Sequence, residues 1–438
     1  DFNAQRALKR AFDPDNVLNP GKVIPPPKDA GQDGKAPAPT LLEQVRGVSV
    51  NGACLAEVIA KIKTAVSQKQ ALRPAGSGTF SRFGNLPNRD TQSLSSLSVA
   101  DVIDYDPPNQ VITVGAGISL AALQEQLKAN NQWLPLRPPF FSADSTIGSL
   151  VALAACGPER MAYGSPRDLL LGLRYIDSAG VLVTAGGRVV KNVAGYDMTR
   201  LLTGSAGTLG FISEVSWRVS TIPERCAAIT AVGPLAAVAA TALDIVQSTL
   251  SAVYVTAQAA EQPAAGKDTG DWKIVVGFEG FSQTVDYQME KCGALLEAAG
   301  LHSPEKADYP VHAGKFRNEF GEMGQAPFIL RADFPLDRVA DFIGLLGDRP
   351  QLSKVFLDFG CGRFLAGLED LSADDWARLC QKIDQHDGHG LLVKAPDEFR
   401  KRNDVFGTPR PEWKVMHRIK AALDPDNIFA PGCLPGRV

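Results

Sequence analysis

Apolar positions along the chain follow two spacings, one typical of helices and one typical of strands. Between residues 55 and 62, apolar residues recur every three or four positions, which predicts the buried face of a helix. Between residues 215 and 219, apolar and polar residues alternate, which predicts a half-buried strand. Short apolar runs at 71–73 and 111–114 predict two more strands, and both lead into glycine-rich loops. A hairpin is expected over 173–183.

The pattern changes near Pro223, where glycine loops become rare. Helices are expected at 237–250, 285–299, 336–346 and 373–386, and strands at 253–257, 273–278, 328–334, 354–359 and 391–394. This succession is typical of an α+β domain of βαβ type. A chain of 438 residues is also longer than one single-core domain usually is.

Two segments near the ends of the chain resemble each other. Leu8–Gly21 reads LKRAFDPDNVLNPG and Ile419–Gly432 reads IKAALDPDNIFAPG, with eight of fourteen positions identical. Each copy predicts a short basic amphipathic helix that ends at Asp-Pro and is followed by a Pro-Gly turn. Residues 25–39 are rich in Pro, Gly, Ala and charge without an apolar period, which predicts a flexible linker.

We divide the chain into five parts: a stub at 1–24, a linker at 25–40, a first domain at 41–222, an α+β domain at 223–395 and a C-terminal segment at 396–438, which is expected to pack back on the first domain.

Composition and charge exclude several classes of protein. With 45 Lys and Arg against 48 Asp and Glu, the net charge of −3 provides no electrostatic surface for nucleic acid. No apolar run reaches the roughly 18 residues needed to span a membrane, and the first residues lack the features of a signal peptide. Seven scattered cysteines without a CxxC pair argue against zinc fingers and iron–sulfur ligation, and favour reduced thiols in the cytosol.

Three loops of glycine and small residues in the first half are candidate ligand-binding segments. Pro74–Thr79 follows a predicted strand, and its small residues would let backbone N–H groups approach a pyrophosphate. The second loop spans 138–168 and the third contains KNVAGYD and GSAGTLGFI, between 191 and 212. The alternatives are an ordinary tight turn for the first loop and a buried helix of small residues for the second. Neither a Walker loop nor a Rossmann fingerprint is present.

Together these loops resemble the FAD-binding domain of the vanillyl-alcohol-oxidase / p-cresol-methylhydroxylase (PCMH) superfamily. KNVAGYD, GSAGTLGFI and YGSPRDLLLG are similar to segments of glycolate oxidase E subunits. The resemblance runs from about residue 41 to the C-terminus and is densest over 71–220. It implies an α+β fold, in which a PCMH-type FAD-binding domain of two subdomains (41–222) lies beneath a ferredoxin-like α+β cap domain.

The resemblance also implies a set of cofactor-binding residues in the three segments. They are Pro74, Ala75, Gly76, Ser77, Gly78, Thr79, Asp144, Thr146, Gly148, Ser149, Gly157, Gly164, Asp168, Gly207, Gly210 and Ile212. Some relatives attach FAD covalently through a His in the first loop. Because no His precedes His302, the FAD is expected to be non-covalent. Cys156, taken as the only thiol of the flavin region, is expected to be a small core residue.

Some features of related proteins are missing. D subunits, like D-lactate and D-2-hydroxyglutarate dehydrogenases, carry His-x-His-x-Gly-Asp-Gly-Asn, which holds a divalent metal. This chain has no such motif, and His386 and His389 are more simply a solvated turn than a metal site. Arg363 could face a cofactor or carboxylate, but a surface arginine is the simpler interpretation. Tyr196 has acid–base capacity, but a packing tyrosine is favoured. Catalytic residues are therefore not assigned.

The resemblance implies the FAD-binding subunit of a glycolate oxidase complex. Such a subunit relays electrons from a D-type flavoprotein subunit to an F-type iron–sulfur subunit and quinone, in the cytoplasm or at the inner membrane through the complex. A self-sufficient flavin-dependent 2-hydroxy-acid dehydrogenase, with its substrate in the cap cleft, is the alternative. A scaffold with a vestigial pocket is a third hypothesis. The intact loops argue against the scaffold, and the missing metal motif argues against the dehydrogenase.

The first 24 residues resemble the C-terminal end of a D subunit. Because the chain also begins at Asp1 rather than Met and continues into the 25–39 linker, we expect a D-type tail fused to an E-type subunit. A misassigned start codon and a cloning remnant are the alternatives. The stub is expected to be disordered or to dock as a short helix through Ala7, Leu8, Ala11 and Phe12.

Overall fold

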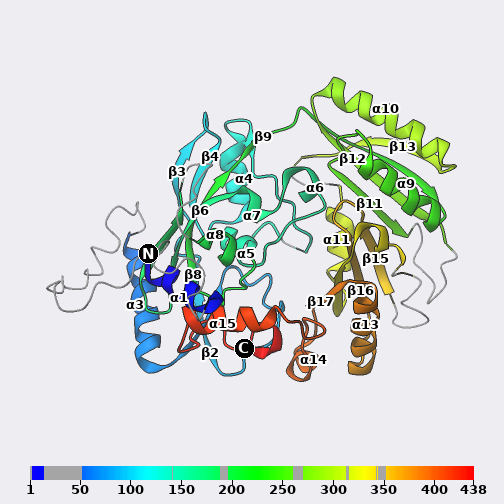
Figure 1. Cartoon of the computed structure of the whole chain (residues 1–438). Helices are drawn as coiled ribbons and strands as arrows, with labels where there is room; N and C mark the ends of the chain where they lie inside the picture. Colours follow the sequence, from blue (N-terminus) through cyan, green and yellow to red (C-terminus); the bar gives the residue numbers. More distant parts are fainter. Residues whose placement is uncertain are drawn as a thin grey trace.

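The structure is a computed structural model of the chain. It describes residues 2–13, 52–140, 142–187, 196–259, 270–311, 315–341, 343 and 352–438. The expected linker and all but the last two residues of KNVAGYD lie outside the described residues. Strands and helices form two bodies side by side, with the C-terminal helices beneath them (Figure 1).

Five antiparallel strands form the central sheet of the first body, in the order β3-β4-β8-β6-β7. They are β3 (Val102–Asp106), β4 (Val111–Gly115), β8 (Phe211–Arg218), β6 (Leu170–Ile176) and β7 (Leu182–Gly186). Most of the alternation over 215–219 lies in β8, but Ser216 and the preceding polar residue Glu214 are buried too. Ser216 hydrogen-bonds to Thr113 of β4, and Glu214 accepts from Arg174 of β6. The hairpin expected over 173–183 is confirmed as β6–β7.

Short helices cover this sheet. α5 packs against β8, and α8 packs against β6 and β7. The helices of this body are α4 (Leu120–Lys128), α5 (Ile147–Ala152), α6 (Arg160–Tyr163), α7 (Pro166–Leu169) and α8 (Met198–Leu202). A small two-stranded sheet, β5 (Gln132–Trp133) with β9 (Ser220–Thr221), closes its edge. The core contains Trp217 and Tyr175, both almost fully buried.

A second, smaller layer contains the first glycine-rich loop. Helix α3 (Gly52–Gln68) buries the predicted apolar face against the parallel pair β1 (Ala71–Ala75) and β2 (Thr91–Ser95). Phe429, from the far end of the chain, forms a parallel bridge with Leu72 of β1. The two subdomains therefore include residues separated by more than 300 positions in sequence.

The cap body has one antiparallel sheet of eight strands, in the order β13-β10-β12-β11-β15-β16-β14-β17. Its strands are β10 (Arg225–Gly233), β11 (Tyr254–Ala259), β12 (Trp272–Gly280), β13 (His302–Asp308), β14 (Phe328–Asp333), β15 (Leu352–Asp358), β16 (Arg363–Leu368) and β17 (His389–Lys394). β10 to β13, with α9 (Leu235–Gln247) and α10 (Ser282–Ala298), follow the ferredoxin-like βαββαβ succession. The strands of the second half are ordered in the same way, and β11 pairs with β15 to join the halves.

Helices pack on both faces of the cap sheet. α9, α10 and α13 (Ala373–Gln385) cover the main apolar core, and α11 (Arg317–Met323) packs on aromatic residues of the other face. The helix expected at 336–346 is described only in part, beginning with the 3-10 turn η1 (Leu336–Arg338). The expected α+β class and ferredoxin-like cap agree with this architecture.

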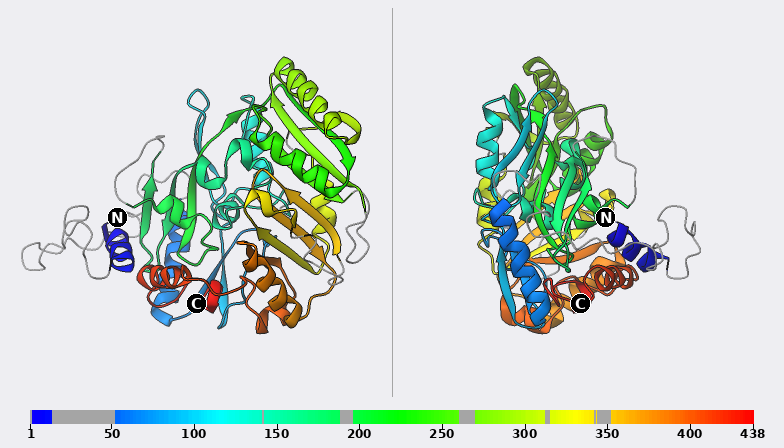
Figure 2. Two further views of the ribbon diagram at one scale, coloured as in Figure 1. Left: turned by 45° about the vertical axis from the view of Figure 1, so that its right-hand side comes forward. Right: turned by 90° about the vertical axis from the view of Figure 1, so that its left-hand side faces the viewer.

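The C-terminal segment contacts the first body through the bridge between Phe429 and Leu72. α14 (Asp397–Arg402), α15 (Trp413–Leu423) and η2 (Pro435–Arg437) lie along the base of both bodies (Figure 1). α1 (Phe2–Phe12), which contains the start of the first repeat copy, packs beside α15 (Figure 2). α1 docks through Ala4, Leu8 and Ala11, whereas Phe12, expected at the contact, is 49% exposed.

Among the described residues, no helix is both long enough and apolar enough to cross a membrane.

Candidate functional site

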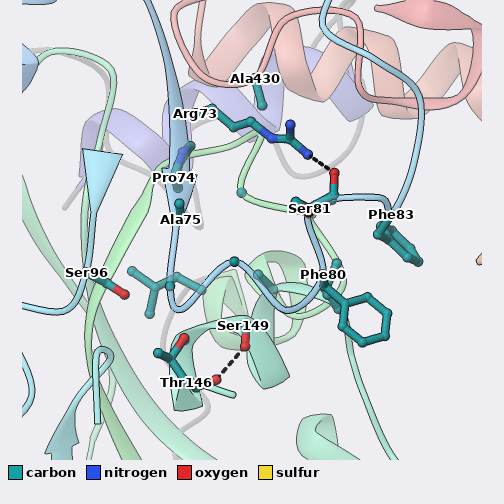
Figure 3. A pocket seen from close by; sticks show the side chains of 18 of the residues that line it. Arg73, Pro74, Ala75, Phe80, Ser81, Phe83, Ser96, Thr146, Ser149 and Ala430 are labelled. Carbon is teal, nitrogen blue, oxygen red and sulfur yellow. Dashed lines mark hydrogen bonds between the residues drawn. The ribbon is translucent and has the colours of Figure 1, made fainter. Parts of the chain in front are cut away.

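A cavity of about 470 Å³ opens where three segments meet (Figure 3). They are the loop after β1 (residues 74–79, the β1 loop), helix α5 and the turn before β8 (residues 206–210). The cavity is lined by Arg73–Gly84 except Arg82, and by Thr91, Ser93, Ser96, Thr146, Gly148, Ser149, Ala152, Leu153, Ala206, Gly207, Gly210, Phe211, Ile212, Ala430 and Cys433. All three predicted segments contribute, so the structure brings together residues that are distant in sequence. Small and apolar side chains predominate, as in many cofactor sites.

The β1 loop lies along one wall of the cavity. Gly78 has φ +81°, in the left-handed region that favours glycine, and a Cβ built there meets no protein atom within 4 Å. The backbone N–H groups of Ser77, Gly78 and Thr79 donate no hydrogen bond to another described group. Successive N–H groups of this kind can bind an anion.

Arg73 is the only charged side chain among the described lining residues. It donates from Nη2 to the carbonyl oxygen of Ser81 at 2.8 Å, which folds the loop back towards β1 (Figure 3). The cavity therefore has a single positive group among its described lining residues, which lies at Ser81, and otherwise neutral walls.

The second wall comes from the start of α5. Gly76 lies so close to Thr146 that an added Cβ would be 2.1 Å from Thr146 Oγ1. That hydroxyl is buried and has no hydrogen-bond partner among the described residues, while Thr79 Oγ1 lies 3.0 Å from Ser145 Oγ. Buried hydroxyl groups are normally satisfied, so Thr146 Oγ1 is available to a ligand.

The third wall is the turn before β8. Gly207 has φ +72°, and a Cβ there would lie 3.3 Å from Pro74 Cβ, so this turn meets the β1 loop closely. Gly210 also lines the cavity, but its missing side chain would face Ile176 and Tyr175 in β6. Gly210 therefore lets β8 pack against β6, and this packing is enough to require glycine.

The C-terminal segment completes the wall with Ala430 and Cys433. Leu72 N donates to Ile428 O, and Ala430 N donates to Leu72 O, both at 2.7 Å, which extends the β1 sheet. Cys433 was not anticipated, and it corrects the expectation that Cys156 is the only thiol of this region. Burial raises the pKa of Cys433, which keeps its thiol neutral. Cys156 is buried in the core, as expected.

A buried lysine fixes this C-terminal segment. Lys420 Nζ pairs with Asp424 and donates to the carbonyl oxygens of Thr208, at 2.8 Å, and Phe429, at 2.7 Å. Asp424 in turn accepts from the backbone N–H groups of Ile428 and Phe429. The lysine thus ties α15, the turn before β8 and the added strand together behind the cavity.

Four predicted site residues do not line the cavity. Asp144 is exposed. A Cβ at Gly157 would clash with Arg137 O at 2.3 Å, so Gly157 is required by packing. Gly164 has φ +85° and lies against Asp168, whose carboxylate accepts from the backbone and hydroxyl of Ser165. These hydrogen bonds lower the pKa of Asp168, which caps α7.

A charged cluster lies on the cap sheet, where β15, β16, β14 and β17 place Asp358, Arg363, Asp333 and His389 at paired positions. Arg363 is only 7% exposed and donates to Asp333 at 2.7 Å, so the surface interpretation of Arg363 is wrong. Arg331 also donates to Asp333, and despite burial the two guanidinium groups lower the pKa of Asp333 to about 2. Burial raises the pKa of Asp358 to about 7.

Histidine and tyrosine candidates have structural surroundings. His386 follows α13 with Nδ1 3.0 Å from Lys382 O, while His389 begins β17. Among the described residues, no three His, Cys, Asp or Glu side chains converge as metal ligands. Tyr196 packs at the margin of the first core.

A buried network joins the two bodies. Arg137, beside Trp133 in the first body, pairs with Glu279 of β12 at 2.8 Å and with Glu159 at 3.3 Å. Tyr163 and Tyr309 donate to the two oxygens of Glu279 at 2.7 and 2.6 Å. No sequence pattern indicates this network, because its members are single polar residues in unrelated segments.

Comparison with known families identifies these segments. Residues 50–186 match the model of the FAD binding domain, and residues 1–23 and 407–434 each match part of the FAD linked oxidases, C-terminal domain. The β1 loop and α5 fall in the first match, and Ala430 and Cys433 fall in the second. Residues 50–186 of this chain are therefore similar to a FAD binding domain.

Relatives of this flavoprotein include subunits of glycolate oxidases. The chain is 37% identical over 162 residues to glycolate oxidase subunit GlcE of Escherichia coli K12, which covers 37% of this chain and 46% of that protein. It is 27% identical to glycolate oxidase subunit GlcD of Bacillus subtilis 168, over 85% of this chain and 86% of that protein. The first match thus spans about half the length of its relative.

A D-lactate dehydrogenase of Archaeoglobus fulgidus is 30% identical over 44% of this chain and 43% of that protein. Among solved structures, an alkyldihydroxyacetonephosphate synthase has a TM-score of 0.60 at 17% identity, over 86% of this chain and 75% of that chain. This last likeness concerns the fold alone.

The residues present fit FAD. Ser77, Gly78 and Thr79 offer N–H groups for a pyrophosphate, Arg73 offers a positive charge, and Thr146 Oγ1 offers an unpaired hydroxyl. FAD, when bound, supplies the redox chemistry. The chain's own task is to bind, orient and shield that group, which the glycine contacts and the C-terminal wall allow.

Proposed function

We propose that the chain is the FAD-binding, E-type subunit of a glycolate-oxidase-type complex. It holds FAD non-covalently in the cavity and relays electrons from the oxidation of glycolate or a similar 2-hydroxy acid. A D-type flavoprotein subunit oxidises the substrate, and an F-type iron–sulfur subunit passes the electrons towards quinone. The complex is cytoplasmic, and it lies at the surface of the inner membrane where it passes electrons to quinone.

The cavity is the single observation that carries this proposal. Three glycine-rich segments and the C-terminal strand converge on a space with one positive group, and no histidine lines it among the described residues. The similarity to glycolate oxidase subunits supports the choice of complex. We propose that the 12 predicted residues that line the cavity contact FAD. They are Pro74, Ala75, Gly76, Ser77, Gly78, Thr79, Thr146, Gly148, Ser149, Gly207, Gly210 and Ile212.

Anaerobic reduction tests the proposal. The purified chain, loaded with FAD, is mixed with glycolate or D-lactate, and the flavin absorbance is followed with and without a D-type subunit. We expect slow or no reduction of the isolated chain and rapid reduction when the D-type subunit is present. Rapid turnover by the chain alone with a dye acceptor would instead support the second candidate below.

A self-sufficient 2-hydroxy-acid dehydrogenase is the second candidate, and the charged cluster of the cap favours it. Arg331 and Arg363 share the single carboxylate of Asp333, which leaves one positive charge that could bind a substrate carboxylate. Asp358 has a buried, unpartnered Oδ1 and a pKa raised by burial to about 7, as suits a proton acceptor. If this second candidate is correct, Arg331→Met should retain FAD and lose turnover of the 2-hydroxy acid.

A further inference from the structure

Two helices of the same repeat pack against each other in this structure. α1 spans Phe2–Phe12 and α15 spans Trp413–Leu423, so both helices have 11 residues and occupy the same positions of the two repeat copies. The segments that contain them both match the C-terminal domain of FAD-linked oxidases. A helix that normally ends one such domain is therefore present twice.

The contact uses equivalent residues of the two copies. α1 buries Ala4, Leu8 and Ala11, which recur at the spacing of one helix face. The corresponding residues of α15 are Val415, Ile419 and Ala422, and all three belong to the same apolar cluster. Three of these six residues are alanines, which allow the helix backbones to approach each other, and Leu8 is only 2% exposed.

α15 uses a different face to bind its own domain. His417 Nε2 lies 2.7 Å from Pro435 O, and Lys420 donates to Thr208 O. Trp413, one turn earlier, is buried beside Gly436. One face of α15 thus holds the FAD-binding body, and the other face receives α1.

α1 also has the residues that hold the equivalent helix α15 against its own domain. Lys9 pairs with Asp13 as Lys420 pairs with Asp424, and in each copy the Asp N–H donates to the Lys carbonyl oxygen at 2.8 Å. In the second copy this pair leads into residues 428–430, which hydrogen-bond to β1 through an isolated bridge. Because the second copy occupies that position on β1, the first copy cannot bind there. The first copy therefore corresponds to the same elements of a second, equivalent domain.

We infer that the face of α15 formed by Val415, Ile419 and Ala422 is a docking surface for the C-terminal helix of a second FAD-linked-oxidase unit. Residues 2–12 are that helix, and the pairing of equivalent helices is the contact between the two units. The D-type identity of the second unit rests on the proposed function. An 11-residue helix is marginally stable by itself, which suits a helix already supported by its own domain or held by a tether.

Complementation between two full-length variants tests the inference. Leu8→Asp spoils the pairing face of α1 and leaves α15 free, while Val415→Asp spoils α15 and leaves α1 free. We expect each variant alone to be monomeric by sedimentation velocity at high micromolar concentration, and the mixture to form a species of twice the mass. Ala4→Asp and Ala422→Asp provide a second pair if either first variant fails to fold.

The matched controls are Arg10→Asp and Met416→Asp, which place the same carboxylate on exposed positions of the two helices. Their mixture is expected to remain monomeric. A monomeric mixture of Leu8→Asp with Val415→Asp would overturn the inference, and so would dimerisation of Val415→Asp alone, because pairing would then not need the docking face of α15. FAD content is measured on the same samples, so failure of the cofactor assignment is distinguished from failure of the docking surface.

Discussion

Replacing Gly78 with valine separates the role of the β1 loop in cofactor binding from its role in folding. A Cβ at Gly78 meets no protein atom within 4 Å, so the valine side chain enters the cavity rather than the core. The cost to folding arises mainly from φ +81°, which is unfavourable for an L-residue by about 1–2 kcal/mol. A β-branched residue lies at the upper end of that range.

The cost to FAD binding is larger. If the valine displaces the pyrophosphate from two of the three N–H groups of Ser77, Gly78 and Thr79, two charge-assisted hydrogen bonds at about 1.5–3 kcal/mol each are lost. The dissociation constant would then rise by roughly two to four orders of magnitude. Gly78→Val should therefore be purified almost without flavin.

Gly300→Val is the matched control for backbone strain. Gly300 follows α10 in the cap, has φ +72°, and also has no protein atom within 4 Å of a built Cβ. Flavin content per chain and thermal melting are measured on both variants. We expect similar losses in melting temperature and a loss of FAD only in Gly78→Val. Full flavin occupancy in Gly78→Val, or equal flavin loss in both variants, would refute the loop assignment.

The remaining predictions concern buried charges. Lys420→Met leaves the Asp424 carboxylate buried without its cation, so we expect a loss of about 3–5 kcal/mol in the free energy of unfolding, together with weaker FAD retention. In Lys401→Met, which breaks an exposed pair in α14, the loss measured by the same denaturant titration should stay below about 1 kcal/mol. For Asp358, burial raises the pKa in the folded chain to about 7, against about 3.9 when unfolded. Between these values the folded state binds more protons, so this carboxyl makes stability fall as pH rises from about 4 to 7. Asp358→Asn should remove that fall in the free energy of unfolding, which is at most about 4 kcal/mol. Thermal melting of the wild type and of Asp358→Asn across this pH range is the measurement, and the same pH dependence in both would contradict this prediction.

The glycine-rich walls of the cavity could be predicted because they leave a local signal. A strand followed by the small residues 74–79 indicates that another group lies close to the backbone, without showing which group it is. Most of the cap was also predicted from periodicity, since α9, α10 and α13 each bury a regular apolar stripe. Three of its strands were missed. β13 is exposed at every residue, so its side chains carry no alternation, and its place is fixed by backbone pairing with β10.

Other parts of the site depend on contacts that sequence spacing does not reveal. Cys433 reaches the cavity because Ile428–Ala430 add to β1, a pairing across more than 350 residues. Arg363 is buried because β14 and β16 pair Asp333 directly opposite it. Gly157 and Gly164 were assigned to the cofactor, yet their neighbours are Arg137 and Asp168. A glycine required by packing and one required by a ligand have the same sequence signal.

Non-covalent binding of FAD in this cavity is the property on which the proposed function depends most directly. The test is the absorbance spectrum of the purified full-length chain, followed by acid precipitation and quantification of released FAD. We expect a flavin spectrum, close to one FAD per chain, and yellow colour that moves entirely into the supernatant. A chain that binds no flavin under reconstitution, or colour that remains in the precipitate, would contradict the account.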